Sequence, residues 1–195
     1  MNSNLLFYII IAILLIQFIF EAVLEYLNAK RYTDVVPNEL SDVFDKEEYR
    51  KSQEYKKTNY RFGMASSVFS LCLTLMFLIF GGFEWIDTIA RSFSDNPILI
   101  ALIFFGIIMI GNDIVTTPFS YYHTFVIEEK FGFNKSTKKL FWADKIKGWI
   151  MMMVIGGGIL ALIIWFFQWA GTNFWVYAWV LIAVFSLFMN LFYSK

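Results

Sequence analysis

Long apolar runs alternate with short charged segments along the chain of 195 residues. Five of these runs are close to the length that an α-helix needs to cross a hydrocarbon core of about 30 Å. The pattern therefore predicts an all-α integral membrane protein, with residues 1–195 forming a single membrane domain. We expect five transmembrane helices, at about residues 5–27, 62–83, 97–117, 149–170 and 174–193.

Two of the connecting segments are much more basic than the others. Segment 28–61 carries eight Lys or Arg residues and segment 119–148 carries six, whereas segment 84–96 has only Arg91. Lys and Arg are enriched in the cytoplasmic loops of membrane proteins. We therefore expect loops 28–61 and 118–148 to be cytoplasmic, with the N-terminus outside and the C-terminus in the cytoplasm.

The composition excludes several classes of protein. With 58% hydrophobic, 21% aromatic and only 16% charged residues, the chain is neither a disordered segment nor a soluble α/β domain. Its sixteen basic and sixteen acidic residues cancel, so there is no net field to attract nucleic acid. We expect the lipid bilayer to surround the protein, and we do not expect nucleic acid as a partner.

Polar residues in the first predicted helix share one face. Gln17, Glu21, Glu25 and Asn28 fall on a narrow stripe at 100° per residue. Ionisable groups at membrane depth cost about 2.5 kcal/mol or more, so they usually face a protein interior or water. We expect this of Gln17 and Glu21, whereas Glu25 and Asn28 can instead lie at the membrane interface.

Two other predicted helices also carry polar positions. Ser66, Ser70 and Thr74 lie on one side of the second helix, although such hydroxyls often bond to carbonyls of their own helix. The third ends with Asn112 and Asp113, and the carboxylate is hard to explain by helix packing alone. Several helices with one polar face each favour a bundle around water or a polar partner. The residues expected to line this chamber are Gln17, Glu21, Ser70, Asn112 and Asp113.

The segment 118–149 carries a resemblance to a known family. It contains the strings Pro118-Phe119, Tyr122-His123-Thr124, Phe125-Val126-Ile127-Glu128-Glu129-Lys130, Gly132-Phe133-Asn134 and Asp144-Lys145-Ile146-Lys147-Gly148. These strings resemble the N-terminal membrane domain of the CAAX prenyl endoproteases, which are multi-spanning zinc metalloproteases that process prenylated C-termini. Residues 36–40 and 176–179 extend the resemblance, and Phe131 departs from it because the family often has His there.

The resemblance implies an architecture and a set of contacts. The five helices would form part of the wall of a large water-filled chamber in the membrane, closed on the cytoplasmic side by the zinc domain. The enclosed substrate would be a lipidated or membrane polypeptide. The membrane would be the cytoplasmic membrane in a bacterium, and the endoplasmic reticulum or inner nuclear membrane in a eukaryote. The residues expected to contact the catalytic domain are Glu128, Glu129, Lys130 and Asn134, with an exposed acidic pair as the alternative for the two glutamates.

The zinc chemistry of that family has no counterpart in this sequence. The family's catalytic domain brings an H-E-x-x-H helix, whose histidines bind zinc and whose Glu is the general base. No such motif occurs in this chain, whose one histidine is His123 and whose one cysteine is Cys72. We expect no catalytic residue, metal ligand or cofactor in this chain, and zinc only in the full-length family enzyme. His123 is interpreted as an interfacial hydrogen-bonding residue, with zinc ligation as the alternative.

Two functions remain open at this point. The first is the membrane domain of a CAAX-type zinc metalloendopeptidase, inactive alone and missing a C-terminal zinc protease domain. The end of the chain at Lys195 would then mark an N-terminal fragment or a free-standing copy. The second is a non-enzymatic multi-pass membrane protein, either a channel or transporter subunit or a partner-binding scaffold. The string from Phe125 to Asn134 favours the first function, and the lack of a zinc motif favours the second.

Overall fold

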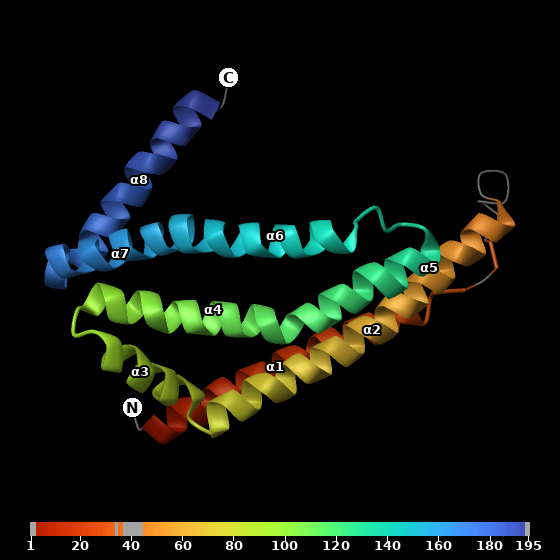
Figure 1. Ribbon diagram of the computed structural model, residues 1–195, viewed down its shortest axis with the longest axis horizontal. Helices are drawn as coiled ribbons and strands as arrows, with labels where there is room; N and C mark the ends of the chain where they lie inside the picture. Colours follow the sequence, from red (N-terminus) through yellow and green to blue (C-terminus); the bar gives the residue numbers. More distant parts are fainter. Residues whose placement is uncertain (1–2, 34, 37–44, 194–195) are drawn as a thin grey trace. The chain divides into compact units, whose positions relative to one another are not determined.

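The regular elements of the protein are helices. The computed structural model describes residues 3–33, 35, 36 and 45–193, and every regular element within them is helical (Figure 1). Residues 37–40 of the string that extends the resemblance lie outside the described residues. The elements are α1 (Ser3–Ala29), α2 (Lys46–Ile79), α3 (Gly82–Phe93), α4 (Pro97–Tyr122), η2 (His123–Glu128), α5 (Glu129–Phe131), α6 (Lys138–Met151), η3 (Met152–Gly156), α7 (Gly157–Ala170), η4 (Gly171–Asn173) and α8 (Phe174–Tyr193).

Among the residues that the structure describes, four helical stretches are long and apolar enough to cross a membrane. They are Asn4–Ala29, Lys46–Ile79, Pro97–Phe131 and Lys138–Leu191. The last stretch contains two of the predicted spans, and the helix axis is interrupted between them at Gly171, which adopts a φ of 55°. A positive φ suits glycine because it has no Cβ. The all-α membrane fold predicted from the sequence is therefore confirmed.

The chain folds as two compact units. The first unit comprises Met1–Glu84 and Asp113–Thr137, and the second comprises Trp85–Asn112 and Lys138–Lys195. Helix α4 starts in the second unit and ends in the first.

In the first unit, α1 and α2 pack side by side in opposite directions (Figure 1). Helix α2 begins at Lys46, well before the apolar segment that starts at Phe62. Asp45 caps the helix, because its side chain accepts a hydrogen bond of 2.8 Å from the Glu47 amide. The charged segment and the apolar segment therefore form one helix of 34 residues. The helix ends at Ile79 because Gly81 follows with a φ of 70°.

The segment after α4 is more helical than the sequence predicted. The helix that contains Pro118 continues through the π-helical turn η2 into α5, inside the segment predicted as a loop. It ends at Gly132, which has a φ of 78°. Beyond it, the amides of Phe133 and Asn134 both donate to the carbonyl of Glu128, at 2.9 and 3.2 Å. The polypeptide thus turns back sharply after α5.

In the second unit, α3 is an amphipathic helix that the hydropathy pattern did not predict. Ile86 and Ala90 are buried one turn apart, while Asp87 and Arg91 form an exposed ion pair of 2.7 Å.

In the same unit, α4 and α7 approach each other closely: a Cβ added at Gly157 would lie 3.7 Å from a methyl of Leu102. Gly157 therefore lies against a side chain of α4. An apolar hollow of about 690 Å³ is lined there by Leu102, Ile103, Phe105, Gly106, Met109, Ile110, Met152, Met153, Gly156, Gly157, Gly158, Leu160 and Ala161.

Candidate functional site

A polar hollow lies between α1 and α2 of the first unit. It has a volume of about 340 Å³. The antiparallel packing brings the polar stripe of α1 opposite the hydroxyl-bearing face of α2, so three of the expected chamber residues, Gln17, Glu21 and Ser70, lie together. The hollow is lined by Leu14, Gln17, Phe18, Glu21, Ser66, Ser67, Ser70, Leu71 and Thr74.

The polar groups of this hollow are only partly satisfied by one another. The Gln17 amide donates a hydrogen bond of 3.0 Å to Oε1 of Glu21. The Oγ of Ser66 is buried and finds no hydrogen-bond partner within the described part of the chain. A buried hydroxyl without a partner costs roughly 1–3 kcal/mol. Ser66 lines the hollow as a residue, but its oxygen is itself out of reach of water.

Asn112 and Asp113, the other two expected chamber residues, lie on α4. Asp113 is half-buried and is not among the residues that line the hollow between α1 and α2, and Asn112 belongs to the second unit. The backbone carbonyl of Asp113 accepts from the hydroxyls of Thr116 and Thr117, at 3.3 and 2.6 Å. These two hydroxyls therefore bond to their own helix, which is the usual behaviour of Ser and Thr in membrane helices.

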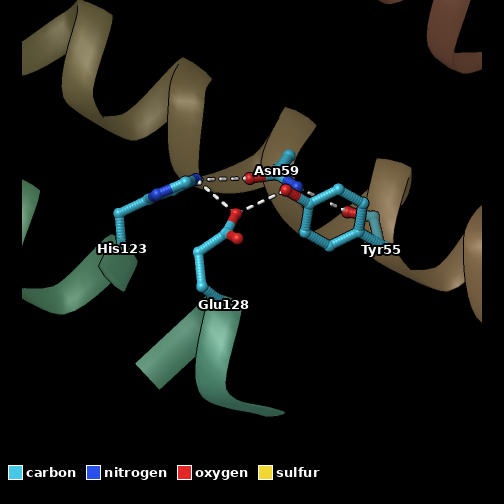
Figure 2. Close-up of polar contacts among 4 residues, drawn as sticks. All are labelled: Tyr55, Asn59, His123 and Glu128. Carbon is cyan, nitrogen blue, oxygen red and sulfur yellow. Dashed lines mark hydrogen bonds and ion pairs between the residues drawn. The ribbon is translucent and has the colours of Figure 1, made fainter. Parts of the chain in front are cut away.

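A second polar cluster joins α2 to the π-helical turn, and Figure 2 shows its four side chains. The Tyr55 hydroxyl donates to Oε1 of Glu128 at 2.5 Å, and Nε2 of His123 lies 3.8 Å from the same oxygen. The His123 nitrogen also lies 2.8 Å from Oδ1 of Asn59. Asn59 in turn donates to the backbone carbonyl of Tyr55 at 3.1 Å. We call Tyr55, Asn59, His123 and Glu128 the junction cluster.

Apolar packing surrounds the junction cluster. The rings of Phe131 and Phe133 meet the Tyr55 ring edge to face, at centroid distances of 5.2 and 4.8 Å. Phe131 and Ile127 are each only 3% exposed, and Gln53 on α2 is 5% exposed. The side chains of His123 and Glu128 keep 36% and 21% of their surface exposed, so this packing shields the hydrogen bonds of the junction cluster from water only in part.

The remaining expected contact residues of the loop differ in exposure. Glu129 and Lys130 are exposed, and Asn134 is half-buried. Asn134 donates a hydrogen bond of 2.8 Å to Oε2 of Glu129, and Lys130 forms an ion pair of 2.8 Å with Glu54 of α2. Of the two adjacent glutamates, Glu128 is therefore held inside the first unit, and Glu129 is available at its surface.

The described residues do not suit a zinc ion. No three His, Cys, Asp or Glu side chains come together among them in a way that could hold a metal. Zinc sites in proteins take three or four such ligands. We therefore derive no zinc-dependent step from these residues. The contact of His123 with Asn59 agrees with its interpretation as a hydrogen-bonding residue.

The sequence alone does not identify three residues of these sites. Tyr55 and Asn59 lie in the charged segment of α2, and their role depends on contacts far along the chain, so no local signal points to them. Ser66 lies on the same side of α2 as Ser70, one turn earlier, but the burial of its hydroxyl is visible only in the folded structure.

Comparison with known proteins connects this geometry to a family. A family described as CAAX prenyl protease N-terminal, five membrane helices, matches residues 25–195. The CAAX prenyl protease 1 homolog of Dictyostelium discoideum is 29% identical over 188 residues, which cover 93% of this chain and 44% of that protein. CAAX prenyl protease 1 of Saccharomyces cerevisiae is 32% identical over 179 residues, covering 86% of this chain and 40% of that protein.

A solved structure gives the same result. The crystal structure of S. mikatae Ste24p matches with a TM-score of 0.83 at 31% identity, over 96% of this chain and 46% of that one. The chain spans less than half the length of each of these relatives.

Proposed function

The chain belongs to the family of CAAX prenyl protease N-terminal domains, and from this membership we propose that it forms the membrane part of a CAAX-type zinc metalloendopeptidase. It is a multi-pass membrane protein. Its proposed role is to enclose a lipidated or membrane polypeptide in a chamber within the bilayer. The membrane would be the cytoplasmic one in a bacterium, and the endoplasmic reticulum or inner nuclear membrane in a eukaryote.

The observation that carries this proposal is the polar hollow between α1 and α2. A carboxylate such as Glu21 is costly at membrane depth unless it faces water or polar protein groups. Glu21 and Gln17 bond to each other at the hollow, and Ser66, whose hydroxyl is buried, lines the same space. In our proposal this hollow belongs to the chamber wall, and Asn112 and Asp113 of α4 line the chamber at another point.

The proposed substrate follows from the relatives. Proteins similar to this chain are named CAAX prenyl protease 1, so the proposed substrate is a polypeptide with a prenylated C-terminus or another membrane polypeptide. Zinc would come from a C-terminal protease domain, since the described residues hold no suitable set of ligands. Residues 1–195 would then supply the enclosure and not the hydrolysis.

The surface of α5 and the turn after it is the proposed contact with that zinc domain. The junction cluster and the turn at Gly132 fix this backbone against α2. Glu129 and Lys130 are exposed on it, and Asn134 is tied to Glu129 by a hydrogen bond. In the proposal Glu128 contributes by holding the surface in place, while Glu129, Lys130 and Asn134 meet the partner domain.

Cysteine labelling tests whether the hollow holds water. Cys72 is exposed, so it is first replaced by Ser, and single cysteines are then introduced as Gln17→Cys and Ser70→Cys. The chain is placed in liposomes and treated on both sides with a charged, water-soluble thiol reagent. We expect both positions to react at least about tenfold faster than lipid-facing positions, because such reagents need water at the thiol.

Matched controls lie at the same depth on the same helices. Ile19→Cys and Val68→Cys point away from the hollow by about half a helical turn and are 58% and 44% exposed. Slow labelling at all four positions would mean that the hollow is closed to water, and the chamber proposal would then be wrong.

A further inference from the structure

A second pocket in the first unit lies where α1 and α2 leave their apolar segments. It has a volume of about 270 Å³. Three of its lining residues are basic and three are tyrosines, and no acidic residue of the described chain lines it. The lining residues are Tyr26, Ala29, Lys30, Tyr32, Lys57, Tyr60 and Arg61.

The position of this pocket along both helices places it at the edge of the bilayer. On α1 the apolar residues end at Ala29, and Lys30 and Arg31 follow at once. On α2 the charged residues end at Arg61, and the apolar segment starts at Phe62. Because the two helices are antiparallel neighbours, both changes from apolar to charged occur at the same level. The pocket therefore opens where lipid headgroups lie.

The side chains around the pocket are arranged to bind an anion with an apolar attachment. Lys57, Tyr32 and Tyr60 are half-buried, so their polar groups are partly desolvated. The Lys30 ammonium lies 4.8 Å from the centre of the Tyr26 ring, a cation–π contact that holds it at the pocket. Lys, Arg and Tyr all donate hydrogen bonds, and the first two add positive charge.

We propose that the pocket formed by Lys30, Lys57, Arg61 and their neighbouring tyrosines binds the phosphate headgroup of an anionic glycerophospholipid. Basic pockets between membrane helices are suited to such headgroups. The tyrosine rings and the lysine stems would cover the glycerol region, and the acyl chains would run along the apolar segments of α1 and α2. The bound lipid would connect the two helices at the membrane surface.

Native mass spectrometry of the full chain in detergent provides the test. Phosphatidylglycerol and phosphatidylcholine with identical acyl chains are titrated separately, and the fraction of protein carrying one lipid is measured. We expect saturable binding of one phosphatidylglycerol, with phosphatidylcholine at least about tenfold weaker. An excess of inorganic phosphate should leave the lipid bound. Full displacement by inorganic phosphate would identify free phosphate as the ligand and overturn the lipid assignment.

Two sets of variants separate a built pocket from general attraction to a basic surface. The pocket variant combines Lys30→Gln, Lys57→Gln and Arg61→Gln, and the control combines Lys135→Gln, Lys138→Gln and Lys139→Gln, which are exposed and remove the same charge. We expect the pocket variant to lose at least about tenfold in affinity and the control to lose less than about twofold. Equal losses would overturn the proposal.

A charge-conserving variant distinguishes a lost headgroup contact from lipid binding lost through misfolding. It combines Lys30→Arg, Lys57→Arg and Arg61→Lys, and it should keep its preference for phosphatidylglycerol because the positive charge remains. If it loses binding as fully as the glutamine variant does, while its circular dichroism stays unchanged, the proposed headgroup contact does not exist.

Discussion

The hydroxyl of Tyr55 donates a hydrogen bond of 2.5 Å to Oε1 of Glu128, across a separation of 73 residues. This bond joins the charged part of α2 to the π-helical turn that follows α4. His123 approaches the same carboxylate oxygen at 3.8 Å. One carboxylate thus connects the segment 113–137 to the helix on which that segment packs.

Removing the donor of this bond should destabilise the first unit. Tyr55→Phe leaves the ring contacts with Phe131 and Phe133 in place but deletes the hydroxyl, so a charged acceptor in a partly shielded site loses a partner. A hydrogen bond to a charged group contributes about 1.5–3 kcal/mol. We expect a decrease of that order in the free energy of unfolding, measured by denaturation in mixed micelles. Tyr8→Phe, at a position that is 67% exposed, should have no measurable effect.

Phe131 should matter far more than its neighbour Phe133, although both rings contact Tyr55. Phe131 is 3% exposed and Phe133 is 53% exposed. Truncation of a buried Phe to Ala costs about 3–5 kcal/mol, because the lost burial is compounded by a cavity. We expect Phe131→Ala to lower the free energy of unfolding by roughly this amount, and Phe133→Ala to cost less than half as much. Similar losses from both substitutions would contradict the packing described here.

Two glycines of the first unit should respond to alanine in opposite directions. Gly132 has a φ of 78°, and an added Cβ there would meet only Lys51 at 3.9 Å, so the penalty comes from the backbone conformation. We expect Gly132→Ala to destabilise by about 1–2 kcal/mol. Gly63 is inside α2 with nothing within 4 Å of an added Cβ. Gly63→Ala should therefore stabilise by roughly 0.5–1 kcal/mol in the same unfolding assay.

Charge reversal at the exposed glutamate tests the proposed contact with a zinc domain. In a protein that joins residues 1–195 to such a domain, we propose that Glu129 pairs with a basic group of the zinc domain. Glu129→Lys should then reduce proteolysis of a prenylated peptide by about tenfold or more, because the new positive charge would repel that group. The fold should survive, since Glu129 is exposed and bonds only locally with Asn134. Cleavage rate and thermal stability are measured on the same samples.

The matched control for this reversal is Glu48→Lys, an exposed position in the first turn of α2. Unchanged cleavage with Glu129→Lys would remove the contact proposal. Glu128→Lys is not a clean probe, because it also breaks the bond to Tyr55.

The membrane fold could be predicted from the sequence because a lipid environment leaves few choices. An apolar run in the bilayer must satisfy its own backbone hydrogen bonds, so it forms a helix. The resemblance read from the string between Phe125 and Asn134 is likewise confirmed by the family match. Helical periodicity placed Gln17 and Glu21 on one face of the first helix and Ser70 on a polar face of the second, whereas their meeting in one hollow depends on how the two helices pack.

The junction cluster could not be predicted, because it depends on contacts between distant segments outside the bilayer. Hydropathy predicts the part of α2 that starts at Phe62, but it does not predict the contacts of the charged part before it, where Tyr55 and Asn59 lie. The continuation of helix through the segment predicted as a loop was missed for a similar reason. Residues 123–131 owe their conformation to packing of Ile127 and Phe131, both 3% exposed, and not to an apolar run.

The π-helical turn at His123–Glu128 has a genetic consequence. A π-helical turn accommodates one more residue than an α-helical turn. Loss of a single codon here would therefore let the helix relax to ordinary α-helical winding, while the residues after the turn keep nearly the same orientation toward α2. Loss of one codon from the α-helical part of α4 would instead rotate everything beyond it by about 100°, and Glu128 and Phe131 would then face away from Tyr55. A deletion of one residue should therefore be tolerated better within the π-helical turn than in the α-helix before it.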